Sequence, residues 1–103
     1  MESHVYILHS SILNQYYIGS TIIPVDLRLE RHLINYYGDK KSTARAKDWI
    51  LFLSIECHSK EQAQKIEKHI KKMKSKKYIE NISKYPEMVH KLLERYLVPG
   101  SSR

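Results

Sequence analysis

Apolar residues gather in three short segments near the start of the chain and then recur at helical spacing. Residues 5–8 and residues 15–19 are rich in β-branched and aromatic side chains, which favour strands. The polar stretch between them, residues 10–14, is typical of a turn, so the two strands are expected to form an antiparallel hairpin ending at Gly19. A nearly continuous apolar run over residues 49–55 predicts a third strand, at the centre of the sheet.

Four helices are expected from the spacing of apolar residues and from the residues that begin helices. The first covers about residues 25–37. Ser59, with Gln62 three positions later, has the spacing of a capping box and begins the second helix. The apolar positions of that helix form one stripe, made of Ala63, Ile66, Ile70 and Met73. Two further helices are expected over residues 75–83 and from Pro86 onward.

The order of these elements predicts an α+β fold, with a small three-stranded antiparallel β-sheet flanked by helices. The chain has 103 residues and is 42% hydrophobic, which suits one compact domain. We expect the main domain over residues 1–83, a C-terminal helix over residues 84–97 packed on it, and a loose tail over residues 98–103.

The composition excludes several classes of protein. Cys57 is the lone cysteine, so internal disulfides and zinc sites built from several cysteines are excluded. No apolar run approaches the roughly 20 residues that cross a membrane, and no signal peptide is apparent at the start. We therefore expect a cytoplasmic protein that makes no membrane contact.

The net charge of +7 lies entirely in the second half of the chain. Residues 57–103 hold twelve basic and five acidic groups, whereas residues 1–56 hold six of each. A basic half favours a polyanionic partner, and DNA bound through its phosphate backbone is the first candidate. The lysines between residues 68 and 77 form either a phosphate track or a solvated helix face. The candidate phosphate contacts are Lys71, Lys72 and Lys74 in this run and Lys41 in the preceding loop.

Four side chains of the hairpin and the first helix can form a small chemical site. Tyr6 lies on the first strand and Tyr17 on the second, followed directly by Ile-Gly. Arg28 and His32 are four residues apart, so they share one face of their helix. Taken singly, each of the four has a structural explanation, because strand tyrosines pack and helical Arg and His residues are common on surfaces. Their joint occurrence around Tyr-Ile-Gly favours a site.

This combination resembles the GIY-YIG nuclease superfamily, which is named for two short motifs on adjacent strands. The second motif is intact at residues 17–19, whereas the first, at residues 4–6, keeps only its tyrosine. The ten residues between the two tyrosines and the Arg-x-x-x-His of the next helix also match. Glu67 matches the glutamate of a later helix in the family. The resemblance covers about residues 4–83, and the chain is most similar in organisation to small, stand-alone, single-domain members of the family.

The resemblance implies a metal-dependent endonuclease that hydrolyses DNA phosphodiester bonds. Tyr6 is then the candidate general base; with an ordinary pKa of about 10, a tyrosine needs a nearby cation for that role. Tyr17 would position water or phosphate, and Arg28 would donate to two phosphate oxygens. His32 would pass on a proton or orient Tyr6. Glu67 would hold one Mg²⁺ (or Mn²⁺) ion, bound mainly together with the substrate because one carboxylate holds it weakly.

Alternatives remain for several of these residues and for the function. Gly19 and Asn81 are further candidates for lining the site, and Gly19 either lets a phosphate approach the backbone or ends its strand. Glu67 can instead pair with Lys71 at i+4. The family implies a role in DNA repair or in the processing of branched DNA. The alternative is a nucleic-acid- or partner-binding module with little or no nuclease activity, whose last helix either forms a homodimer face or packs on its own domain.

Overall fold

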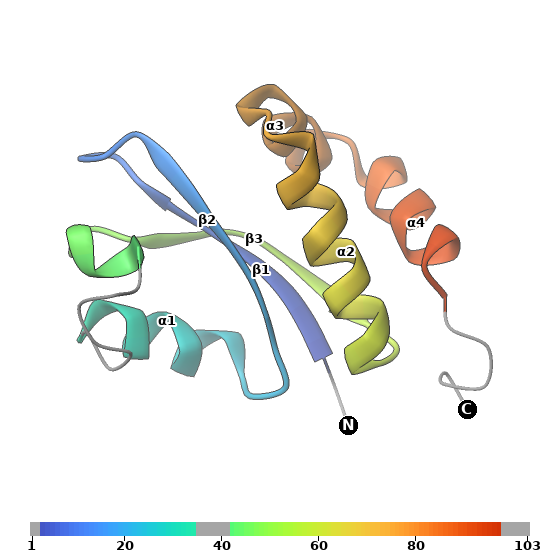
Figure 1. Cartoon of the computed structure of the whole chain (residues 1–103), viewed down its shortest axis with the longest axis horizontal. Helices are drawn as coiled ribbons and strands as arrows, with labels where there is room; N and C mark the ends of the chain where they lie inside the picture. Colours follow the sequence, from blue (N-terminus) through green and yellow to red (C-terminus); the bar gives the residue numbers. More distant parts are fainter. Residues whose placement is uncertain (1–2, 35–41, 98–103) are drawn as a thin grey trace.

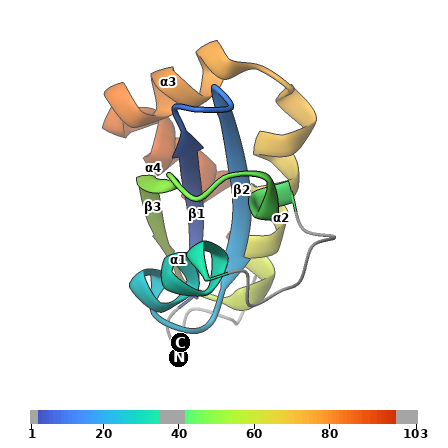
Figure 2. The same ribbon diagram turned by 90° about the vertical axis from the view of Figure 1, so that its left-hand side faces the viewer.

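The computed structural model describes residues 3–34 and 42–97 (Figure 1). Its antiparallel sheet has the order β2-β1-β3, formed by β1 (Ser3–Ser10), β2 (Gln15–Thr21) and β3 (Ile50–Cys57). The helical elements are α1 (Val25–Leu33), the short 3₁₀ helix η1 (Ser42–Arg45), α2 (Lys60–Met73), α3 (Lys76–Lys84) and α4 (Pro86–Arg95). Figure 2 shows α1 on one face of the sheet and α2, α3 and α4 behind the other. The α+β fold expected from the sequence is confirmed.

The central strand is β1, so the prediction that residues 49–55 form the central strand was wrong. Strand β1 pairs with β2 on one side and with β3 on the other. Its residues 5–8 are fully buried, because helices cover both faces of the strand. Strand β3 has a neighbour on one side in the described sheet, and Ile50 at its start is 58% exposed. The apolar run at residues 49–55 reflects packing at one edge of the sheet.

Alternation along β1 divides the interior into two layers. Val5 and Ile7 pack against α2, α3 and α4. Tyr6 and Leu8 point to the other face, where they pack against Trp49 and the start of α1. Tyr6, whose side chain ends in a hydroxyl, therefore lies in the layer between α1 and the central strand of the sheet.

A compact turn leads from β2 into α1. The Thr21 hydroxyl accepts a hydrogen bond from the backbone N–H of Ile23 at 3.0 Å and donates to the Ile23 carbonyl at 3.2 Å. Pro24 is the N-cap of α1, and its fixed φ suits that position. The described helix ends at Leu33 with Ile34, whose ψ is near 8°, as its C-cap; residues 35–37 of the expected helix lie outside the described residues.

Gln62 joins the start of α2 to α4. The Ser59 hydroxyl accepts from the Gln62 backbone N–H at 3.1 Å, which is the cap expected from their spacing. The buried Gln62 amide accepts from the His58 N–H and donates to the Leu93 carbonyl, both at 2.6 Å. These bonds hold α4 against α2. Met73, expected in the apolar stripe of α2, is 44% exposed because it ends the helix beside α4. Over the described residues, the helices are too short and too polar to span a bilayer.

Candidate active site

Tyr6 and Gly19 face each other across the β1–β2 pair. A Cβ atom added at Gly19 would lie 2.6 Å from the Tyr6 Oη atom and 2.7 Å from its Cζ atom. Gly19 therefore makes room for the Tyr6 ring, which crosses directly over its backbone. Strand β2 continues to Thr21, so the expectation that the strand ends at Gly19 was wrong.

The Tyr6 hydroxyl lies between two side chains of α1. Arg28 donates to the Tyr6 oxygen from Nη2 at 2.9 Å and from Nε at 3.3 Å, with its guanidinium 5.5 Å from the ring centre. The same oxygen lies 3.0 Å from His32 Nε2. Because arginine only donates, the hydroxyl proton of a neutral Tyr6 is directed toward His32 Nε2. A neutral His32 then carries its own proton on Nδ1. Tyr6 and His32 are both buried.

Tyr17 completes this cluster from the second strand. It lies two residues from Gly19, so its side chain is the diagonal neighbour of Tyr6 on the same face. The Tyr17 ring lies 4.8 Å from the His32 ring at an edge-on angle of 60°, and 6.2 Å from the Tyr6 ring. The adjacent Tyr16 points to the opposite face and packs against Phe52 at 5.0 Å. The structure thus brings together Tyr6, Tyr17, Arg28 and His32.

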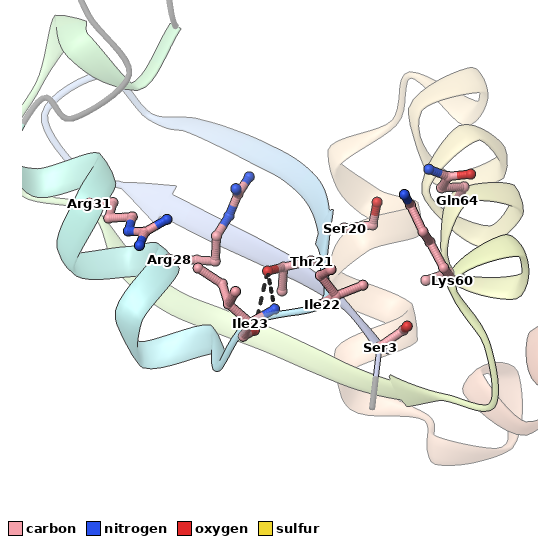
Figure 3. A pocket seen from close by; sticks show the side chains of 10 residues that line it. Ser3, Ser20, Thr21, Ile22, Ile23, Arg28, Arg31, Lys60 and Gln64 are labelled. Atoms are coloured by element: carbon pink, nitrogen blue, oxygen red, sulfur yellow. Dashed lines mark hydrogen bonds between the residues drawn. The ribbon is translucent and has the colours of Figure 1, made fainter. Parts of the chain in front are cut away.

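A basic cleft of about 220 Å³ lies beside this cluster (Figure 3). Arg28 and Arg31 of α1 line one side, Lys60 and Gln64 of α2 line the other, and the turn over residues 21–23 lies between them. Three cations and no carboxylate are found among the described residues that line it. Sequence reasoning missed Arg31 and Lys60. The i+3 spacing from Arg28 could have identified Arg31, but no local signal places Lys60 there.

Glu67 lies on the same side of α2 as the cleft residues of that helix. It follows Ala63 by four positions and Gln64 by three, and both of these line the cleft. Its side chain is 19% exposed, and Oε2 pairs with Lys71 Nζ at 2.6 Å. The described residues contain no group of three or more metal-ligating side chains. One carboxylate, with water and substrate phosphate as further ligands, is a mode in which proteins hold Mg²⁺, so this donor set fits that ion.

The remaining candidates fall in different places. Lys71 and Lys74 line a shallow pocket with the start of β2, next to Glu67 along α2. Lys72 lines a separate groove between α2 and α4. Asn81 lies on α3, on the face of the sheet opposite α1, and its carbonyl accepts the N–H that caps that helix. Lys41 lies outside the described residues.

Asp48 fixes the hairpin that carries both tyrosines. Ser10 Oγ donates to one of its carboxylate oxygens at 2.6 Å, and the Ile12 N–H donates to the other at 2.8 Å. The Ser10 hydroxyl also accepts from the Leu13 N–H at 3.1 Å, which closes the turn. The hydrogen bond from Ser10, followed by that from Ile12, holds the pKa of Asp48 below its usual 3.8.

The fold and this cluster define a small α+β domain with a polar site between the sheet and α1. The family profile described as GIY-YIG catalytic domain matches residues 2–80, which is most of the chain. The chain belongs to the GIY-YIG family, a family of nucleases, and the resemblance seen in the sequence is confirmed. A search of curated proteins and a search of solved structures each found no match. Helix α4 lies beyond the matched region.

Proposed function

We propose that the chain is a divalent-metal-dependent endonuclease that hydrolyses DNA phosphodiester bonds. The observation that carries this proposal is the Tyr6 hydroxyl, held between Arg28 and His32 beside a cleft lined by three cations. Hydrolysis needs an acceptor for the proton of the attacking water and positive charge at the phosphate. The cluster offers both, because Arg28 and His32, about one helical turn apart on α1, flank the Tyr6 hydroxyl of β1.

The proton moves through the pair of Tyr6 and His32. The Tyr6 oxygen takes the proton of the attacking water while its own proton passes to His32 Nε2, 3.0 Å away. Without substrate, Arg28 donates two hydrogen bonds to the Tyr6 oxygen. That oxygen has two lone pairs, so no acceptor position is left for a water proton. A phosphate in the cleft draws Arg28 toward itself, because a charged acceptor binds guanidinium more strongly than a phenol does. This movement uncovers the Tyr6 oxygen for water.

The other side chains orient the water and hold the DNA. Tyr17 contacts the edge of His32 and limits the directions in which the imidazole can turn. Arg31 and Lys60 bind phosphates on either side of the scissile one. Glu67 would hold the metal ion, which when bound supplies positive charge to the phosphate and the leaving oxygen. Lys71, which pairs with that carboxylate, would have to release it when the ion binds.

The test is cleavage of labelled DNA by wild type, Tyr6→Phe and Glu67→Gln with Mg²⁺, Mn²⁺ or EDTA. Tyr16→Phe and Glu61→Gln are matched controls, since Tyr16 packs on the opposite face and Glu61 lies outside the cleft lining on the same helix. We expect metal-dependent cutting that falls by a factor of about 10² or more in the two site variants and survives in the controls. Salt-sensitive binding without cutting in any metal would instead identify a binding module.

The choice of substrate assigns the biological role. We propose a role in DNA repair or in the processing of branched DNA, in the cytoplasm, and the lone buried thiol of Cys57 fits a reducing compartment. The panel therefore includes linear duplex, flap, four-way junction and single strand. Preference for the flap or the junction is the expected result. Equal cutting of every substrate would contradict this role and leave a non-selective nuclease.

A further inference from the structure

A second basic surface lies on the other flank of α2. A groove of about 670 Å³ lies between α2 and α4 and is lined by Lys65, Lys68, His69, Lys72, Met73, Arg95 and Tyr96. It shares no residue with the cleft that contains Arg28. The part of the chain that the structure describes places four cations and no carboxylate in its lining, and none of the four forms an ion pair there.

The groove is held in shape by contacts between the two helices. His69 Nδ1 lies 2.8 Å from the Tyr96 hydroxyl, and the Arg95 guanidinium lies 5.4 Å from the centre of the Tyr96 ring. The hydrogen bond from the Gln62 amide to the Leu93 carbonyl holds α4 against α2 about one helical turn before Tyr96. Helix α4, with Arg95 and Tyr96, lies beyond the residues matched by the family profile. The groove depends on the packing of this helix beside α2.

The charges in the groove favour an anion. Burial and then the fields of Arg95 and Lys72 lower the pKa of His69. The groups that act on this imidazole or contact it are Lys72 of α2, Arg95 and Tyr96 of α4, and the ring of Tyr78 on α3, 5.9 Å away, and the groove lining adds Lys65 and Lys68. All the formal charges in this set are positive, so they repel one another until an anion enters.

We propose that the groove between α2 and α4 binds the phosphate backbone of nucleic acid at a point removed from the scissile phosphate. The inference rests on the proposed nucleic-acid substrate. The residues from Lys65 to Lys72 rise about 10 Å along the helix axis, so their three lysines are spread along the groove and can contact successive phosphates of one strand. Flexible lysines bind phosphates without reading bases, so this contact adds affinity and orientation but no sequence preference.

The test is binding of a fluorescent 20-bp duplex in EDTA, where cleavage plays no part. The groove variant carries Lys65→Gln, Lys68→Gln and Lys72→Gln. The matched control carries Lys77→Gln, Lys84→Gln and Lys91→Gln, which removes the same charge from exposed positions outside the groove. We expect the groove variant to lose at least about tenfold in affinity and about 2–3 from the slope of log K against log salt. An equal loss in both variants would overturn the proposal, and unfolding curves check that both are folded.

NMR of His69 gives a second readout. The added duplex should raise the pKa of His69, because phosphate offsets the field of Arg95 and Lys72. An equal response to inorganic phosphate at the same phosphate concentration would overturn the backbone assignment in favour of a free anion.

The two proposals fail separately. If wild type cuts DNA but the groove variant binds it as well as the control variant does, this inference fails and the nuclease stands. If no metal supports cutting but the groove variant loses binding, the nuclease fails and the groove stands.

Discussion

The closest constraint in the site is the contact between Gly19 and Tyr6, and Gly19→Ala tests it directly. An alanine Cβ would lie 2.6 Å from the Tyr6 oxygen and 2.7 Å from Cζ, whereas ordinary contacts begin at 3.4 Å. The ring must therefore retreat by about 0.8 Å. It has no free space to enter, because Tyr6 is fully buried in the layer beneath α1.

The magnitude follows from two opposing terms. Overpacking a buried side chain costs about 1–3 kcal/mol, whereas alanine in place of a strand glycine gains about 0.5–1 kcal/mol. We expect a net loss of about 1–2 kcal/mol, or roughly 5–10 °C in melting temperature for a domain of this size. The displaced hydroxyl also loses its hydrogen bonds to Arg28 and His32, so cleavage should fall about 10²-fold.

A double-mutant cycle with Tyr6→Leu, measured by urea unfolding, separates this clash from other effects. Leucine has no atoms where Tyr6 Cζ and Oη lie, so Gly19→Ala in that background should be neutral or stabilising. The expected coupling is about 1.5–3 kcal/mol. Ser20→Ala, at the next position of β2, is the control and should change stability little. If Gly19→Ala costs the same in both backgrounds, or nothing in wild type, the steric explanation is wrong.

Three further predictions use other parts of the molecule. Arg28→Lys keeps the charge but not the paired Nε and Nη2 donors, so the rate of single-turnover cleavage should fall at least about tenfold. An unchanged rate would show that the paired donors are not needed. Because the pKa of Asp48 is lowered from 3.8 in the folded chain, its carboxylate stabilises the fold above that pH, and this stabilisation is lost as the pH falls through and below 3.8. Asp48→Asn should therefore reduce the fall in melting temperature on acidification through this range, and parallel wild-type and variant profiles would refute this. Burial raises the pKa of Cys57 to about 11, so iodoacetamide at pH 8 should modify it only after urea unfolding, and rapid labelling of the folded chain would contradict that burial.

The secondary structure was largely predictable because the relevant signals are local. The Ser59 cap, the turn before β2 and the apolar spacing of α2 each depend on residues a few positions apart. The order of the strands was not predictable in this way. An apolar run identifies a strand but not its neighbours, and residues 49–55 read as central although β1 lies between the other two.

In the candidate site too, the residues of a local motif were predictable and those that depend on tertiary contacts were not. Tyr6, Arg28 and His32 were identified from a motif, and their convergence requires only that α1 pack over the hairpin. The steric role of Gly19 could not be predicted from local sequence, because it depends on the Tyr6 side chain of the neighbouring strand. Lys60 was missed because it reaches the cleft from the start of α2, across the end of β2.

The basic half of the chain shows why composition alone could not assign its function. Read along the sequence, the lysines form one run, but helical periodicity distributes them over two flanks of α2. Lys60, Lys71 and Lys74 turn toward β2 and the side of Glu67. Lys65, Lys68 and Lys72 turn toward α4, where Arg95 completes a separate groove. A single count of charge therefore combines lysines on the side of the candidate site with lysines of the separate groove, and the two proposals give these groups different roles. Neutralising the first set should lower the cleavage rate of bound DNA, and neutralising the second should lower binding alone.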